Sequence, residues 1–168
     1  MQARAFAVVR ILIGVIFVWR GIAKLIDPSF LFGGLMLEIA EHGTPYTFYQ
    51  RFVLSRFVEY HQEFFAYAVG LGGTLVWLSF VTGTMVSWAA LGGALMMLNF
   101  GLATSAGNPL NMVLYSLFAL LFLALGRFGV GATWGVDGWL AKRVRGGFIF
   151  FPLRLSLPRH AAAARARK

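Results

Sequence analysis

Ionisable and amide side chains stand at the ends of four long apolar stretches of the sequence. Arg20 and Lys24 close the first stretch, and Glu63 and Tyr67 open the second. The remaining polar groups lie where the third stretch ends and the fourth begins: Asn99, Asn108, Asn111 and Tyr115. Ionisable groups are costly in hydrocarbon, so within membrane spans they mark a functional site by default. Cations, a carboxylate, amides and phenols together can bind an anion or a carbonyl group.

We predict an ion pair between Lys24 and Glu63, with the amides and phenols donating hydrogen bonds beside it. Three alternatives remain open for the same residues. Arg20 and Lys24 could extend to the lipid headgroups. Glu63 could lie at the water boundary, and Asn99 and Asn111 could form hydrogen bonds that only join helices.

The composition places these residues in a membrane protein. The chain is 59% hydrophobic and 12% charged, with a mean hydropathy of +0.74. A helix crosses the hydrocarbon core with about 20 apolar residues, and four segments qualify: residues 5–26, 63–83, 85–104 and 109–126. The alternation of barrel strands is absent. We therefore predict an all-α integral membrane four-helix bundle over residues 1–126.

Residues 27–62 mix aromatic and charged side chains, and Gly43-Thr44-Pro45 divides them in two. This pattern predicts two short interfacial helices over the outer face of the bundle. Their aromatic side chains could anchor at the headgroups, or the segment could form a lid over a pocket.

The formal charge of +9 comes mostly from a basic tail over residues 127–168. The positive-inside rule places that tail and both termini in the cytoplasm, so no nucleic-acid partner is needed to explain the charge. The ends that carry the polar groups then share the outer leaflet. A second apolar piece, Gly147–Leu157, is too short to span.

Cysteine is absent, and His42, His61 and His160 lie outside the predicted spans. We therefore expect no disulfide, iron–sulfur cluster, intramembrane haem or other metal site, and no covalently bound cofactor. If the protein moves electrons, it needs a diffusible carrier such as quinone. The aromatic and methionine side chains within the spans could line a quinone-sized slot, although ordinary bundle packing also explains them.

Four motifs give the chain a resemblance to a known family. The first runs from Arg10 through Gly14, Phe17 and Gly21 to Lys24-Leu25. The second is Leu98-Asn99-Phe100, and the third is Gly107-Asn108-Pro109-Leu110-Asn111. The fourth begins at Gly126-Arg127-Phe128-Gly129 and closes with Trp134-Gly135-Val136-Asp137-Gly138-Trp139-Leu140. Over roughly residues 7–143 the chain resembles the DoxX/DoxD family, and most closely the small subunit of thiosulfate:quinone oxidoreductase.

The resemblance implies a subunit that couples oxidation of a small sulfur oxyanion to quinone reduction at the outer leaflet of a bacterial or archaeal cytoplasmic membrane. Arg20 and Lys24 would contact the anion or the quinone carbonyls, and Glu63 would accept a proton. Asn99 and Asn111 would orient the ligand, with Tyr67, Asn108 and Tyr115 beside them. Other protein subunits would share the reaction.

One departure from the family pattern favours a different function. Gly73 stands where family members usually carry a glutamate, and Glu63 lies nearly three helical turns earlier. The alternative function is therefore a non-catalytic subunit that assists assembly of a larger respiratory or photosynthetic complex.

Overall fold

Four long helices form the body of the protein in a computed structural model that describes residues 2–128 and 130–143. They are α1 (Gln2–Ile26), α4 (Gln62–Thr82), α5 (Val86–Thr104) and α6 (Pro109–Arg127). Each contains a stretch long and apolar enough to cross a bilayer. The described residues contain no strand. The predicted all-α four-helix membrane bundle is thus confirmed, and the predicted span limits fall within a few residues of the observed ones.

Local sequence signals explain where the spans end. Gly83 ends α4 in the left-handed conformation, at φ 70°, where a residue without Cβ is favoured. Asn108 is the N-cap of α6, and its side-chain oxygen accepts a hydrogen bond of 3.0 Å from the amide of Leu110. Pro109 is the first helical residue, as the sequence predicts, because proline has no amide hydrogen to satisfy there.

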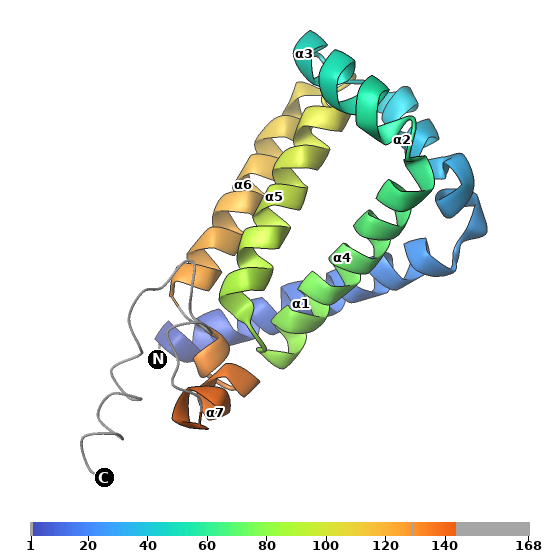
Figure 1. Ribbon diagram of the computed structural model, residues 1–168. Helices are drawn as coiled ribbons and strands as arrows, with labels where there is room; N and C mark the ends of the chain where they lie inside the picture. The colour runs from blue at the N-terminus through green and yellow to red at the C-terminus, as the bar shows by residue number, and fades with distance from the viewer. Residues whose placement is uncertain (1, 129, 144–168) are drawn as a thin grey trace.

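The spans form two pairs, because α1 packs along α4 and α5 packs along α6. The pairs lie close together near the start of α1 and diverge toward the other end of the bundle (Figure 1). Aromatic side chains fill the narrow end, among them Phe80 and Phe122, which are fully buried. Trp19 is 74% exposed, whereas Arg10 on the same helix is fully buried. Such exposed apolar faces suit contact with lipid.

Residues 27–62 fold over the open end of the bundle (Figure 1). They form η1 (Phe30–Gly34), α2 (Leu35–His42), α3 (Thr47–Tyr49) and η2 (Gln50–Val58). Phe30, Leu31, Leu35 and Leu54 pack in a second core against Ala66 and Ala103 of the spans. The short helices and the break at residues 43–45 agree with the sequence prediction. We call residues 27–62 the cap and this side of the molecule the capped end.

At the opposite end, η3 (Val130–Ala132) and α7 (Val136–Arg143) pack back onto the bundle. The fully buried Arg10 donates from Nη1 to the carbonyl of Val130 at 2.9 Å and from Nη2 to the carbonyl of Trp134 at 3.1 Å. The segment predicted as a tail therefore contributes helices to the body of the protein. Its remainder, residues 144–168 with the apolar piece Gly147–Leu157, lies outside the described residues.

Asp137 links α7 to the turn between α4 and α5. Its Oδ1 accepts from the amide of Met85 at 2.6 Å, and its Oδ2 accepts from the amide of Val86 at 3.0 Å. Burial raises the pKa of the Asp137 carboxyl, and these two donors together with the charge of Arg10 oppose that rise. Arg10 and Asp137 thus join α1, η3, α7 and the turn between α4 and α5.

Candidate functional site: a pocket at the capped end

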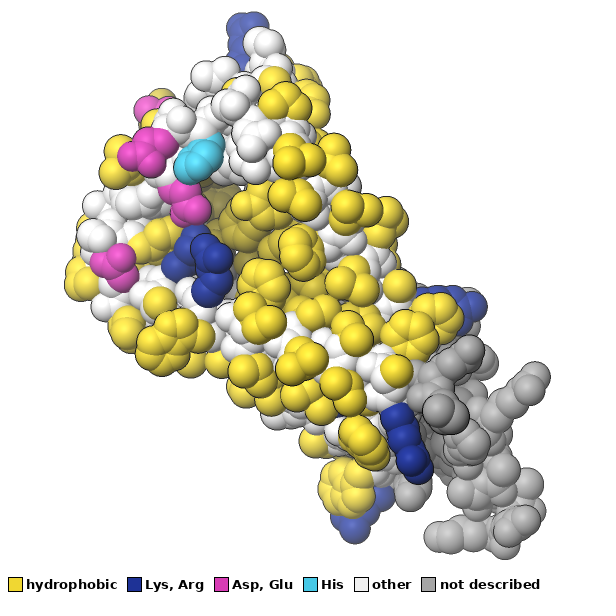
Figure 2. All heavy atoms as spheres, turned by 180° about the vertical axis from the view of Figure 1, so that it is seen from behind, with side chains coloured by type: hydrophobic (Ala, Val, Ile, Leu, Met, Phe, Trp, Pro, Cys, Tyr) yellow, Lys and Arg dark blue, Asp and Glu magenta, His cyan; other side chains and the backbone are white. Residues whose placement is uncertain are grey.

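A pocket of about 460 Å³ lies between the two diverging pairs of helices, beneath the cap. All four spans and the cap contribute residues to it. Figure 2 shows the hollow, with basic and acidic side chains at its edge and hydrophobic side chains inside. This is the size and character of pockets that take small organic ligands.

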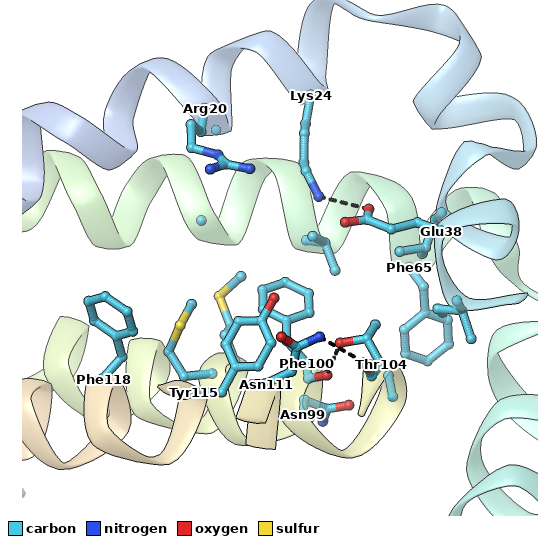
Figure 3. A pocket seen from close by; sticks show the side chains of 18 of the residues that line it. Arg20, Lys24, Glu38, Phe65, Asn99, Phe100, Thr104, Asn111, Tyr115 and Phe118 are labelled. Atoms are coloured by element: carbon cyan, nitrogen blue, oxygen red, sulfur yellow. Dashed lines mark hydrogen bonds and ion pairs between the residues drawn. The ribbon is translucent and has the colours of Figure 1, made fainter. Parts of the chain in front are cut away.

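Lys24 of α1 and Glu38 of α2 form an ion pair at the edge of the pocket (Figure 3). Lys24 Nζ lies 3.0 Å from Glu38 Oε2. The same ammonium lies 4.5 Å from the ring centre of Phe30 and 5.9 Å from that of Phe100, within the range of cation–π attraction. The predicted ion pair between Lys24 and Glu63 is therefore wrong, because the cap brings a different carboxylate to the lysine.

Arg20 lies one helical turn before Lys24 and lines the same pocket. Its side chain is exposed. Within the described part of the chain it makes no hydrogen bond or ion pair. The guanidinium is therefore available to a ligand. We define the polar rim of the pocket as Arg20, Lys24, Glu38, Asn99 and Asn111.

The two asparagines are each held by one hydrogen bond. The hydroxyl of Tyr49 donates to Oδ1 of Asn99, which leaves the Asn99 amide hydrogens available. Burial raises the pKa of the Tyr49 phenol, so the hydroxyl keeps its proton as a donor. Asn111 donates from Nδ2 to the carbonyl of Thr104 at 3.3 Å, which leaves its Oδ1 as an acceptor. The rim therefore offers both donors and acceptors to a ligand.

The interior of the pocket is aromatic and sulfur-rich. Phe17 stacks on Trp77 with ring centres 4.4 Å apart, and it meets Phe118 edge to face at 5.9 Å. Met96 and Met97 line the same space. We call these residues the apolar floor. Gly73 also lines the pocket, and a Cβ there would meet only Met96 Cε and Trp77 Nε1, each at 3.6 Å. The glycine therefore leaves room in the pocket that a larger side chain would occupy.

The structure brings most of the sequence-predicted site residues together. The pocket is lined by five of them: Arg20, Lys24, Asn99, Asn111 and Tyr115. In Figure 3, Arg20 and Lys24 extend from α1, and Tyr115 and Asn111 extend toward them from the opposite side of the pocket.

Three predicted site residues lie elsewhere. Glu63 is exposed in the first turn of α4, and Tyr67 is 48% exposed; neither lines the pocket. Asn108 is occupied as the N-cap of α6. Glu63 and Tyr67 lie away from the pocket because Val69, Gly73 and Trp77 form the face of α4 that lines it.

Sequence reasoning missed Glu38 and Tyr49, which reach the pocket from the cap. The sequence does contain a signal for Glu38. Leu35 and Ile39 lie one helical turn apart and line the pocket, and Glu38 directly precedes Ile39. That spacing places Glu38 next to the apolar face of α2. The interpretation of residues 27–62 as a lid pointed in this direction without naming a residue.

Comparison of the chain with protein-family models, curated proteins and solved structures found no match. Functional inference therefore rests on the pocket. The aromatic side chains of such a slot can contact the faces of a flat ring. The cations and amide donors at the edge can bind the polar substituents of that ring.

Proposed function

We propose that this protein is the membrane subunit of a DoxX/DoxD-like oxidoreductase that binds a quinone in the pocket. The reaction couples quinone reduction to oxidation of a small sulfur oxyanion such as thiosulfate. Other subunits of the complex take part in this reaction. The observation that carries the proposal is the joining of a cationic polar rim to an aromatic floor in one cavity. The motifs of the family resemblance contribute several residues to its lining, among them Phe17, Lys24 and Asn111.

The proposal gives each part of the pocket a role. The quinone ring lies against the apolar floor, and its carbonyl groups accept hydrogen bonds from the Asn99 amide. Arg20 and Lys24 hold the oxyanion at the rim, and their positive charge beside the carbonyl oxygens stabilises the reduced ring as electrons arrive. Reduction of a quinone takes up two electrons and two protons. Two thiosulfate ions supply one electron each as a sulfur–sulfur bond forms between them, and Glu38 replaces Glu63 as the carboxylate that transfers the two protons from water.

The proposal also includes a location and an orientation. We place the protein in a bacterial or archaeal cytoplasmic membrane, with the capped end outside and both termini in the cytoplasm, in accordance with the basic residues after Gly126. A soluble anion then reaches the rim from the outer aqueous phase.

Lys24→Ala tests the proposal directly. We expect thiosulfate-dependent quinone reduction in isolated membranes to fall by about a hundredfold or more, because one preorganised cation at a site of developing negative charge is worth that much. Arg56→Ala, in η2 and outside the pocket, is the matched control and should retain activity. Unchanged activity in the Lys24 variant, at equal protein abundance, would remove the proposal.

Gly73→Leu tests whether the floor holds the quinone. The added side chain would extend into the pocket, so we expect the KM for quinone to rise by about tenfold or more. Gly72→Leu is the control, because this neighbouring glycine lies outside the pocket lining and a Cβ there meets only Met96 Sδ, at 3.9 Å. Equal KM values for the two variants would place the quinone elsewhere.

A non-catalytic role in assembling a larger membrane complex is the second candidate. Gly73 favours it, because the resemblance leads us to expect a carboxylate at that position, whereas this chain has a glycine beside Met96 and Trp77. Purification in mild detergent separates the two functions. A monodisperse protein that reduces quinone without any partner would exclude the assembly role.

A further inference from the structure

The ion pair between Lys24 and Glu38 stands at the position where an anionic ligand would bind. We infer that Glu38 is a specificity-determining residue: Arg20 and Lys24 form an oxyanion seat, and the Glu38 carboxylate pairs with the lysine of that seat until a small divalent oxyanion displaces it and binds both cations. This inference deepens the proposed function, on which it rests for the role of the anion.

The geometry shows that the carboxylate is removable. Glu38 Oε2 lies 3.0 Å from Lys24 Nζ, and the two side chains are 47% and 30% exposed. No other hydrogen bond to the Glu38 carboxylate exists within the described residues. Water therefore competes for both groups, and an exposed pair of this kind is weak.

The lysine has support of its own. The rings of Phe30 and Phe100 lie 4.5 Å and 5.9 Å from its ammonium. They hold the charge near the pocket whether or not Glu38 is present. Phe30 is buried in the second core of the cap, so that contact is fixed in place. When the Glu38 carboxylate leaves, the Lys24 ammonium therefore stays in place at the edge of the pocket.

The balance of charge at the polar rim sets which anion can displace Glu38. With Glu38 in place, Arg20 and Lys24 carry two positive charges against one negative charge. When the carboxylate leaves, both cations are open. A small oxyanion with two charges neutralises both, whereas a singly charged one replaces the carboxylate with no gain in charge. The rim therefore selects divalent oxyanions, the class to which thiosulfate and sulfate belong.

Calorimetric titration of the purified protein in phosphatidylcholine nanodiscs tests the inference without requiring turnover. We expect the wild type to bind thiosulfate and sulfate and to bind nitrate at least about tenfold more weakly. Glu38→Gln should bind thiosulfate about fivefold more tightly, because the competing carboxylate is gone. Glu41→Gln is the matched control, a carboxylate on the same helix outside the pocket, and its affinity should equal that of the wild type.

Arg20→Gln and Lys24→Gln complete the test of the seat. Each removes one cation from the seat, and we expect each to weaken thiosulfate binding by about tenfold. Circular dichroism and size-exclusion chromatography of every variant confirm that the fold is retained.

Unchanged or weaker thiosulfate binding by Glu38→Gln would overturn the inference, and so would nitrate binding equal to that of sulfate. An anionic phospholipid found on the rim by native mass spectrometry, and not displaced by thiosulfate, would also overturn it. Failure of the proposed function can be told apart from failure of this inference. If the protein never reduces quinone but its anion binding still responds to Glu38→Gln, the oxidoreductase function is wrong and the oxyanion seat stands.

Discussion

Arg10→Met is expected to lower the free energy of unfolding by about 3–5 kcal/mol, because it removes a buried charged donor from its hydrogen-bond acceptors and from a nearby buried carboxyl group. The substitution leaves the carbonyl groups of Val130 and Trp134 without their donor. It also leaves the carboxyl of Asp137, 1% exposed, without its nearby positive charge. Thermal unfolding in detergent, followed by circular dichroism, measures the loss.

The space around Arg10 adds to this expectation. A Cβ on Gly83 would lie 2.6 Å from Arg10 Nη1, and one on Gly135 would lie 2.9 Å from the same atom. The guanidinium therefore fills the space between two glycine backbones. A methionine side chain has no hydrogen-bond donor to place in that space.

Arg20→Met is the matched control for this prediction. It makes the same change on the same helix, but Arg20 is exposed and has no hydrogen bond within the described residues. Its stability should stay within about 0.5 kcal/mol of the wild type. A melting temperature for Arg10→Met within about 2 °C of the wild type would contradict the assigned role.

Gly14→Ala is expected to destabilise the bundle by about 1–3 kcal/mol through overpacking between α1 and α4. An added Cβ would lie 2.7 Å from Val81 Cγ2 and 2.8 Å from the backbone nitrogen of Val81. It would also lie 3.0 Å from the carbonyl oxygen of Trp77. Backbone atoms cannot turn aside as a flexible side chain does, so the two helices must move apart. Thermal unfolding in the same detergent measures this loss.

Gly92→Ala provides the comparison for Gly14. This glycine lies within α5, and an added Cβ would meet only Val76 Cγ2, at 3.8 Å. Alanine is the better helix former, so the variant should match or slightly exceed the wild type in stability. Equal destabilisation by the two substitutions would show that close helix approach at Gly14 is not the cause.

Local signals in the sequence determined the elements of the fold. Apolar length predicts the four spans, because a helix must cover the hydrocarbon core. Asn108 and Pro109 predict the start of α6, and Gly43-Thr44-Pro45 predicts the break within the cap. Spacing along α1 also predicts that Arg20 and Lys24 share a face, since residues four apart lie on one side of a helix. Each of these features depends on residues within a few turns of each other.

Tertiary structure alone decided which carboxylate meets Lys24. Glu38 and Glu63 both stand near the capped end, and the path of residues 27–62 over the bundle brings Glu38 to the lysine and leaves Glu63 exposed. That path depends on how the second core packs, which no periodicity encodes. The same holds at the other end, where 120 residues separate Arg10 from its acceptor on Val130. Contacts between distant segments arise from the packing of whole elements, so spacing along the chain could not specify them.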